Sequence, residues 1–88
     1  MNAEWVRAVE DNPNYAINLL TGTVRSLPHW VVDTAGSRRH VRGQVLRPVL
    51  CTSKAAYQVT LSRGRAGRRT YSLGTLLANA RERHRWHA

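Results

Sequence analysis

The chain has 88 residues, of which 42% are hydrophobic, none is Phe and one is Cys. A length below about 100 residues predicts one small domain, and no apolar run approaches the ~20 residues that a membrane-spanning helix needs. The 14 Lys and Arg residues exceed the 5 Asp and Glu residues and give a formal net charge of +9, which is typical of proteins that bind a polyanion.

The first residues lack the pattern of an export signal. Residues 1–12 contain no apolar stretch of about 7 to 15 residues behind a basic start, so we expect no secretory signal and a cytoplasmic protein. Trp5 and Val9 belong to a short opening segment. It ends at residues 11–14, whose sequence DNPN is a strong turn signal.

Two runs rich in β-branched and aromatic residues come next. Residues 15–19 and 23–27 predict the strands of a β-hairpin, because Gly22 between them can adopt the positive φ of a tight turn. Residues 28–43 contain a proline, two glycines and a basic cluster, and they predict a long loop with a short strand at residues 30–32.

The second half predicts another hairpin and a helix. Residues 44–50 favour a strand, which Pro48 confines to a sheet edge or a strand end because it lacks a backbone N–H. Residues 55–62 alternate between apolar and polar side chains, and a glycine-containing turn leads to a similar run at 69–73. Thr75 is the predicted N-cap of a helix that extends to about Arg83.

These elements predict an α+β fold, in which two β-hairpins form one small antiparallel sheet and the C-terminal helix packs on its apolar face. The predicted core residues are Ile17, Leu19, Val24, Leu46, Tyr57, Val59, Leu61, Tyr71, Leu73, Leu76 and Leu77. A homodimer that forms through an edge strand or through Trp86 is compatible with this fold.

Residues with catalytic or metal-binding chemistry form no recognised pattern. The five carboxylates include no pair with the spacing of a general acid and base, and His84 and His87 have no third ligand nearby. Cys51 lies beside two apolar residues and favours the role of a small buried hydrophobic side chain. We therefore expect no enzyme activity, no metal and no cofactor; a remnant nuclease that uses His84 or His87 is the enzymatic alternative.

Positive charge gathers in the second part of the chain. Residues 1–35 hold two cations and four anions, whereas residues 36–88 hold twelve cations and one anion. Thirteen of the cations are Arg, whose planar guanidinium suits phosphate and guanine, although a GC-rich coding sequence gives the same bias. The predicted nucleic-acid-binding residues are Arg38, Arg39, Arg42, Arg47, Lys54, Arg63, Arg65, Arg68 and Arg69.

The order of several short motifs resembles the N-terminal module of phage and intron HNH endonucleases. The motifs are Trp5, NYAIN at 14–18, GTVRSL at 22–27, GQVLRP at 43–48, YQVTL at 57–61 and RTYSLGTLLA at 69–78. The resemblance covers residues 4–80 and leaves a basic tail at 81–88, within a single domain of residues 1–88. Ala56, Gly74 and Thr75 depart from the pattern, where the family has Gly, His and Arg.

In that family the module is a small antiparallel sheet followed by a helix, and it contacts DNA beside a nuclease domain. The resemblance implies a non-catalytic phage or mobile-element protein that stands alone, because residues 81–88 cannot form the His-Asn-His core. We expect duplex DNA as the partner, in a bacterial or phage-infected host cell.

The alternative is a phage-type factor that binds and inhibits an acidic host protein through Trp30 or Trp86. RNA is a weaker candidate, since no aromatic pair lies on adjacent predicted strands, and no membrane partner is expected.

Overall fold

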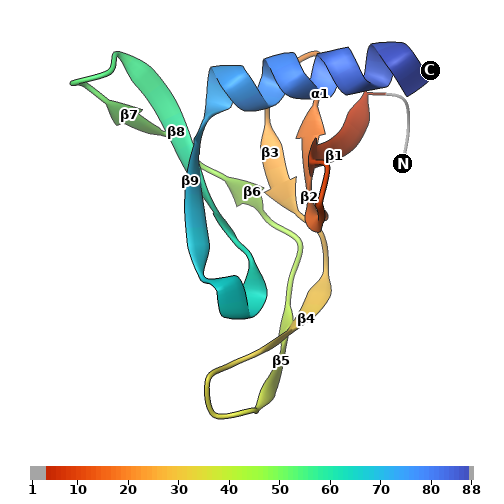
Figure 1. Ribbon diagram of the computed structural model, residues 1–88, viewed down its shortest axis with the longest axis vertical. Coiled ribbons are helices and arrows are strands. Elements are labelled where there is room, and N and C mark those ends of the chain that lie inside the picture. The colour runs from red at the N-terminus through yellow and green to blue at the C-terminus, as the bar shows by residue number, and fades with distance from the viewer. Residues whose placement is uncertain (1–3, 88) are drawn as a thin grey trace.

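A computed structural model describes residues 4–87, without the side chains of Arg65 and His87. In chain order its elements are β1 (Trp5–Val9), β2 (Asn12–Asn18), β3 (Val24–Ser26), β4 (His29–Val32), β5 (Arg38–Val41), β6 (Val45–Leu46), β7 (Val49–Cys51), β8 (Ala56–Ser62), the 3-10 helix η1 (Gly64–Ala66), β9 (Arg68–Ser72) and α1 (Leu73–His87). Helix α1 lies along one side of the molecule, and the strands extend away from it (Figure 1). The molecule is flat, with extents of 39 × 35 × 19 Å.

The described strands form three antiparallel sheets, ordered β1-β2-β3-β6, β4-β5 and β7-β8-β9. The predicted α+β fold with one C-terminal helix is confirmed, although the strands divide among three sheets instead of one. Two further strands were not predicted. The opening segment pairs with β2 as β1, and the predicted long loop folds back as the hairpin β4–β5.

The β2–β3 hairpin confirms the first predicted hairpin and shows why its turn forms. The side-chain oxygen of Asn18 accepts hydrogen bonds from the backbone N–H groups of Leu20 and Thr21, at 2.9 and 3.1 Å. Gly22 adopts a φ of +75°, and its N–H donates to the carbonyl of Asn18 at 2.8 Å. Asn and Gly therefore supply the turn chemistry that the chain needs at this position.

Pro48 divides the strand that was predicted over residues 44–50. Its missing N–H ends the ladder, so the chain leaves the first sheet after β6 and enters the third sheet at β7. Gly43 permits the close approach of this segment to β3, because a Cβ there would lie 3.0 Å from the carbonyl oxygen of Ser26. Ser26 and Gln44 exchange hydrogen bonds across the same approach, from Ser26 N–H to the Gln44 carbonyl and from Gln44 N–H to Ser26 Oγ.

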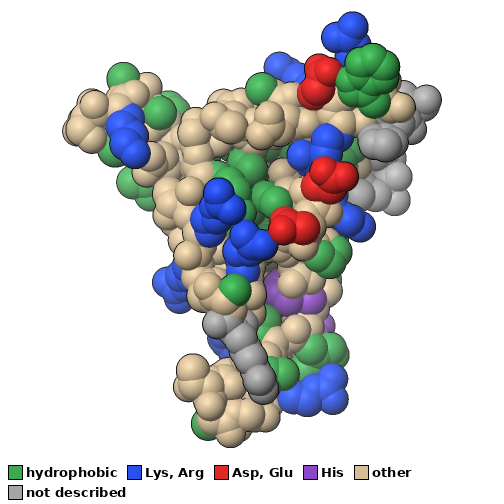
Figure 2. Space-filling view, in the orientation of Figure 1, with side chains coloured by type: hydrophobic (Ala, Val, Ile, Leu, Met, Phe, Trp, Pro, Cys, Tyr) green, Lys and Arg blue, Asp and Glu red, His purple; other side chains and the backbone are tan. Residues whose placement is uncertain are grey.

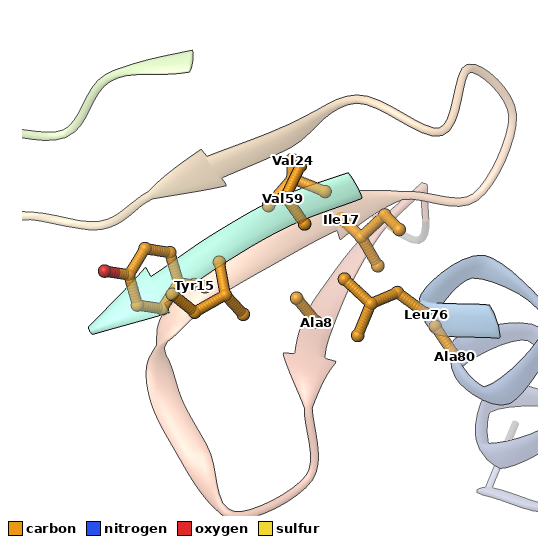
Figure 3. Packing of buried hydrophobic residues seen from close by; sticks show 8 residues of the cluster. Ala8, Tyr15, Ile17, Val24, Val59, Leu76 and Ala80 are labelled. Carbon is orange, nitrogen blue, oxygen red and sulfur yellow. The ribbon is translucent and has the colours of Figure 1, made fainter. Parts of the chain in front are cut away.

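The core lies where β8 crosses β2 and β3 beneath α1 (Figure 3). Five predicted core residues are buried there: Ile17, Val24, Val59, Leu61 and Leu76. Leu19, Leu46, Tyr71, Leu73 and Leu77 are half-buried around them. Ala8, Tyr15, Ala16 and Ala80 are also buried and were not predicted.

Tyr57 was predicted to be buried and is 56% exposed. It pairs with the exposed Leu50 of β7, at the end of the third sheet that projects from the body (Figure 1). The predicted alternation of β8 is correct, because Tyr57 shares a face with Val59 and Leu61. The sheet projects beyond the core at Tyr57, so nothing in the described part of the chain buries this residue.

Helix α1 begins at Leu73, two residues before the predicted N-cap Thr75, and continues to His87. β9 leads into it without a linking loop, so no separate N-cap at Thr75 is needed. Two arginines join the second half of the helix to the body. Arg81 donates twice to the carbonyl of Leu19, at 2.8 and 3.2 Å, and Arg83 donates to the carbonyl of Arg7 at 2.6 Å. Over the described residues, no helix has the length and apolar character to cross a membrane.

Candidate nucleic-acid interface

The β4–β5 hairpin presents two different faces. Its register places Trp30 opposite His40 and Val31 opposite Arg39. Opposed residues share a face and successive residues alternate, so Trp30 and His40 lie on one face and Val31 and Arg39 on the other. We call the Trp30 side the outer face and the Arg39 side the inner face.

The inner face borders a groove of about 580 Å³ between this hairpin and the β8–β9 hairpin. Arg39 lines it from β5, and Arg68 lines it from β9. Polar groups of β8 and of the β5–β6 link complete the walls, including the side chains of Thr60, Ser62 and Gln44. The groove thus has a cationic side chain on each of two separate elements.

A second depression of about 440 Å³ continues this groove along β8. The two share Leu46 and Thr60 as lining residues, and the second adds Arg47. Asp33, at the end of β4, is the one carboxylate among the described residues that line either part. Its side chain accepts the backbone N–H groups of Ala35 and Ser37, at 3.0 and 2.8 Å. We refer to both parts together as the basic groove.

Hydrogen bonds fix the β8–β9 wall of the basic groove. The hydroxyl groups of Thr60 and Thr70 lie 2.9 Å apart across the two strands. At the end of β8, the backbone N–H of Ser62 donates to the Tyr15 hydroxyl at 2.9 Å, and Asn12 donates to the Ser62 carbonyl at 3.1 Å. β2 therefore holds this end of the β8–β9 hairpin in place.

The remaining predicted contact residues do not all join this groove. Arg38 lies on the outer face, where its guanidinium carbon is 5.3 Å from the ring centroid of Trp30. Arg42 is exposed in the link between β5 and β6. Arg69 shares a face with Leu61 and Tyr71, opposite to the groove side of β9, and its guanidinium carbon is 5.2 Å from the Tyr71 ring centroid.

Three further predicted residues lie elsewhere or cannot be placed. Arg63 forms a 2.9 Å ion pair with Asp11, so its charge is already neutralised within the chain. Lys54 lies in the β7–β8 turn, at the end of the third sheet that projects from the body (Figure 1). The side chain of Arg65 falls outside the described part of the structure.

The distribution of charge differs across the face shown in Figure 2. The visible acidic side chains gather over α1 and the first strands, whereas the part that holds β4 and β5 shows Lys or Arg without Asp or Glu. On this face, Lys or Arg side chains without a visible acidic neighbour lie around the β4–β5 hairpin.

Sequence reasoning missed the neutral donors of the basic groove. Thr60 and Ser62 are polar positions of the strand predicted at residues 55–62, and they were not among the predicted contact residues. The pairing of β8 with β9 identifies them, because it places Thr60 opposite Thr70 and Ser62 opposite Arg68. His29 also lines the groove and was not predicted as a contact residue; its ring is fixed by a 2.5 Å hydrogen bond from Nδ1 to the carbonyl of Leu27.

Two observations concern metal ligands and the single thiol. The described residues contain no group of three or more His, Cys, Asp or Glu residues that could hold a metal ion. Cys51 is half-buried and not buried as predicted, because it lies on the projecting strand β7. A hydrogen-bond contact with the Ser53 hydroxyl, at 3.2 Å, lowers the pKa of its thiol.

Comparisons with known proteins find no matching family model, no matching curated protein and no matching solved structure. The resemblance to the HNH endonuclease module thus stays a prediction that no relative tests. Among the described residues, the basic groove brings together cationic and neutral hydrogen-bond donors.

Proposed function

We propose that this protein binds duplex DNA without cutting it, and that the basic groove contacts the phosphates. The observation that carries the proposal is that three arginines from separate strands and links line one continuous groove: Arg39, Arg47 and Arg68. Within the described residues, none of the three forms an ion pair. With Asp33 as the one carboxylate in the lining, an anion from outside would relieve the repulsion among the three arginines.

The neutral groups of the groove suit the same ligand. Phosphate oxygens in protein–DNA complexes accept hydrogen bonds from Arg and from Ser, Thr and Gln side chains. The groove offers the hydroxyls of Thr60 and Ser62 and the amide of Gln44 beside the arginines. Such contacts position a protein on DNA without reading its sequence, so we expect affinity that depends little on base sequence.

The motifs that resemble the endonuclease module support the framework of this proposal. Asn18 and Gly22 form the β2–β3 turn, and Gly43 allows β6 to approach β3. These three residues build the fold, whereas Gln44, Arg47 and Thr60 of the same motifs line the basic groove. On this basis we propose that the chain is such a DNA-contacting module, of phage or mobile-element origin.

A titration of the full chain against a DNA duplex at several salt concentrations tests the proposal. We expect the logarithm of the binding constant to fall linearly with the logarithm of salt concentration, by about 0.9 per phosphate contact. The double variant Arg39→Gln/Arg68→Gln should lose two contacts and reduce the slope by about 1.8. Plasmid incubated with the protein and Mg²⁺ should remain intact.

The matched control removes the same charge away from the groove. Lys54 lies on the projecting β7–β8 turn and Arg85 is exposed on α1, so the variant Lys54→Gln/Arg85→Gln keeps the groove unchanged. We expect its salt slope to stay close to that of the original chain. Equal losses in both double variants would show that net charge, and not the groove, drives binding. Absence of DNA binding, together with capture of an acidic protein after nuclease treatment, would favour the alternative partner.

A further inference from the structure

The outer face of the β4–β5 hairpin carries an exposed aromatic side chain that the phosphate-binding groove does not use. Trp30 is 61% exposed. The guanidinium carbon of Arg38 lies 5.3 Å from its ring centroid, and the His40 ring meets it edge-on, with centroids 5.1 Å apart at 64°. These two neighbours hold the indole in one orientation while most of it remains open to solvent.

This cluster does not contribute to the described core, to which β1, β2, β3, β8 and α1 contribute instead. Trp30 pairs with His40, and Arg38 pairs with Val32, on the same two strands. Trp is enriched at interaction sites because its ring joins a large apolar surface to a polar N–H. The nearest carboxylate in sequence, Asp33, already accepts two backbone N–H groups of the hairpin turn.

The chemistry of this face defines its ligand. The part of the indole that Arg38 and His40 leave open can bind another flat π-system by stacking, and Arg38 together with the neighbouring Arg39 favours a ligand that carries negative charge. A nucleobase attached to its phosphate combines both properties. In a paired duplex the faces of the bases are covered by their neighbours, so only an unpaired base can stack on Trp30.

We infer that the outer face of β4–β5 is a stacking site for an unpaired nucleobase, next to the groove that contacts the phosphates. The inference rests on the proposed function, because Arg39 in the groove and Arg38 on the outer face are consecutive residues of one strand. A strand that follows the groove therefore passes the edge of the hairpin. The protein then prefers DNA that contains a bulge or a single-stranded segment over the fully paired duplex.

Two DNA probes of equal length test the preference: a fully paired duplex and the same duplex with one unpaired base. Stacking on Trp30 should make the full chain bind the second probe about tenfold more tightly, as expected for one base–aromatic stack. Trp30→Ala should remove that preference and keep the salt-dependent affinity for the paired duplex. Trp30→Phe should retain part of it. Because the indole is exposed, neither variant should change the thermal unfolding transition by more than a few degrees.

Trp86 provides the matched control, since it is 74% exposed on α1 and donates to Glu82 at 2.7 Å. Trp86→Ala should leave the preference unchanged. The inference is overturned if the original chain binds both probes equally, or if Trp30→Ala weakens both to the same extent. In these cases a normal salt slope would still support the proposed function. If neither probe is bound and Trp30→Ala abolishes binding to an acidic protein, both the inference and the proposed function fail.

Discussion

The arginines near α1 and those of the basic groove differ in what their guanidinium groups contact. Arg81 and Arg83 donate to backbone carbonyls of Leu19 and Arg7, and Arg7 itself donates to the carbonyl of Glu10 at 2.9 Å. The groove arginines Arg39, Arg47 and Arg68 have no protein acceptor of this kind among the described residues. A count of positive charges therefore overestimates the charge that is free to bind a ligand, because part of it joins the helix to the strands.

The largest change in stability should come from replacing an arginine that joins the helix to the strands. Arg81→Ala removes two hydrogen bonds to the Leu19 carbonyl, and we expect the free energy of unfolding to fall by about 2 kcal/mol. Chemical denaturation measures this loss. Arg85→Ala, on the same helix, should change stability by less than about 0.5 kcal/mol. Similar losses in both variants would show that Arg81 contributes only through its charge.

Next in size is the effect of a single groove arginine on affinity. Arg47→Gln should weaken duplex binding about tenfold at low salt, because a charge-assisted hydrogen bond to phosphate is lost. Arg69→Gln removes the same charge from the opposite face of β9 and should weaken binding about twofold at most. Fluorescence anisotropy with a labelled duplex compares the two. A larger loss for Arg69→Gln would place the DNA on the face of Tyr71 instead.

The variant Arg25→Met tests whether every arginine near the body stabilises the fold. Its guanidinium carbon is 5.6 Å from the ring centroid of Trp5, but its Nε is buried without a hydrogen-bond partner. Arg25→Met keeps the packing and removes the unsatisfied group, so stability should rise or stay constant within about 1 kcal/mol. A loss above that value in thermal unfolding would reveal a role for the charge.

The smallest effect on stability and affinity should come from releasing Arg63 from its ion pair with Asp11. Asp11→Asn breaks its exposed ion pair, which costs less than about 1 kcal/mol of stability. The freed guanidinium then adds one cation beside the groove, and we expect duplex affinity to rise about two- to threefold at low salt. An unchanged salt slope in the binding titration would mean that Arg63 lies outside the contact surface.

The sequence predicted those elements whose local pattern is strong. Alternation at residues 55–62, the turn at Gly22 and the apolar spacing of α1 were sufficient for two hairpins and the helix. The β5 strand was missed because its sequence, RRHV, has no apolar alternation and forms only by pairing with β4. The role of each arginine could not be predicted, since pairs such as Arg63–Asp11 and Arg81–Leu19 join residues 52 and 62 positions apart.

Strand β8 has a core side and a groove side, with Val59 and Leu61 on the first and Thr60 on the second. The molecule is only 19 Å thick, so no second layer separates the two. A ligand in the groove should consequently oppose the local opening of β8. A bound ligand should slow amide hydrogen exchange along β8 more than along β1, and it should raise the midpoint of unfolding as its concentration increases.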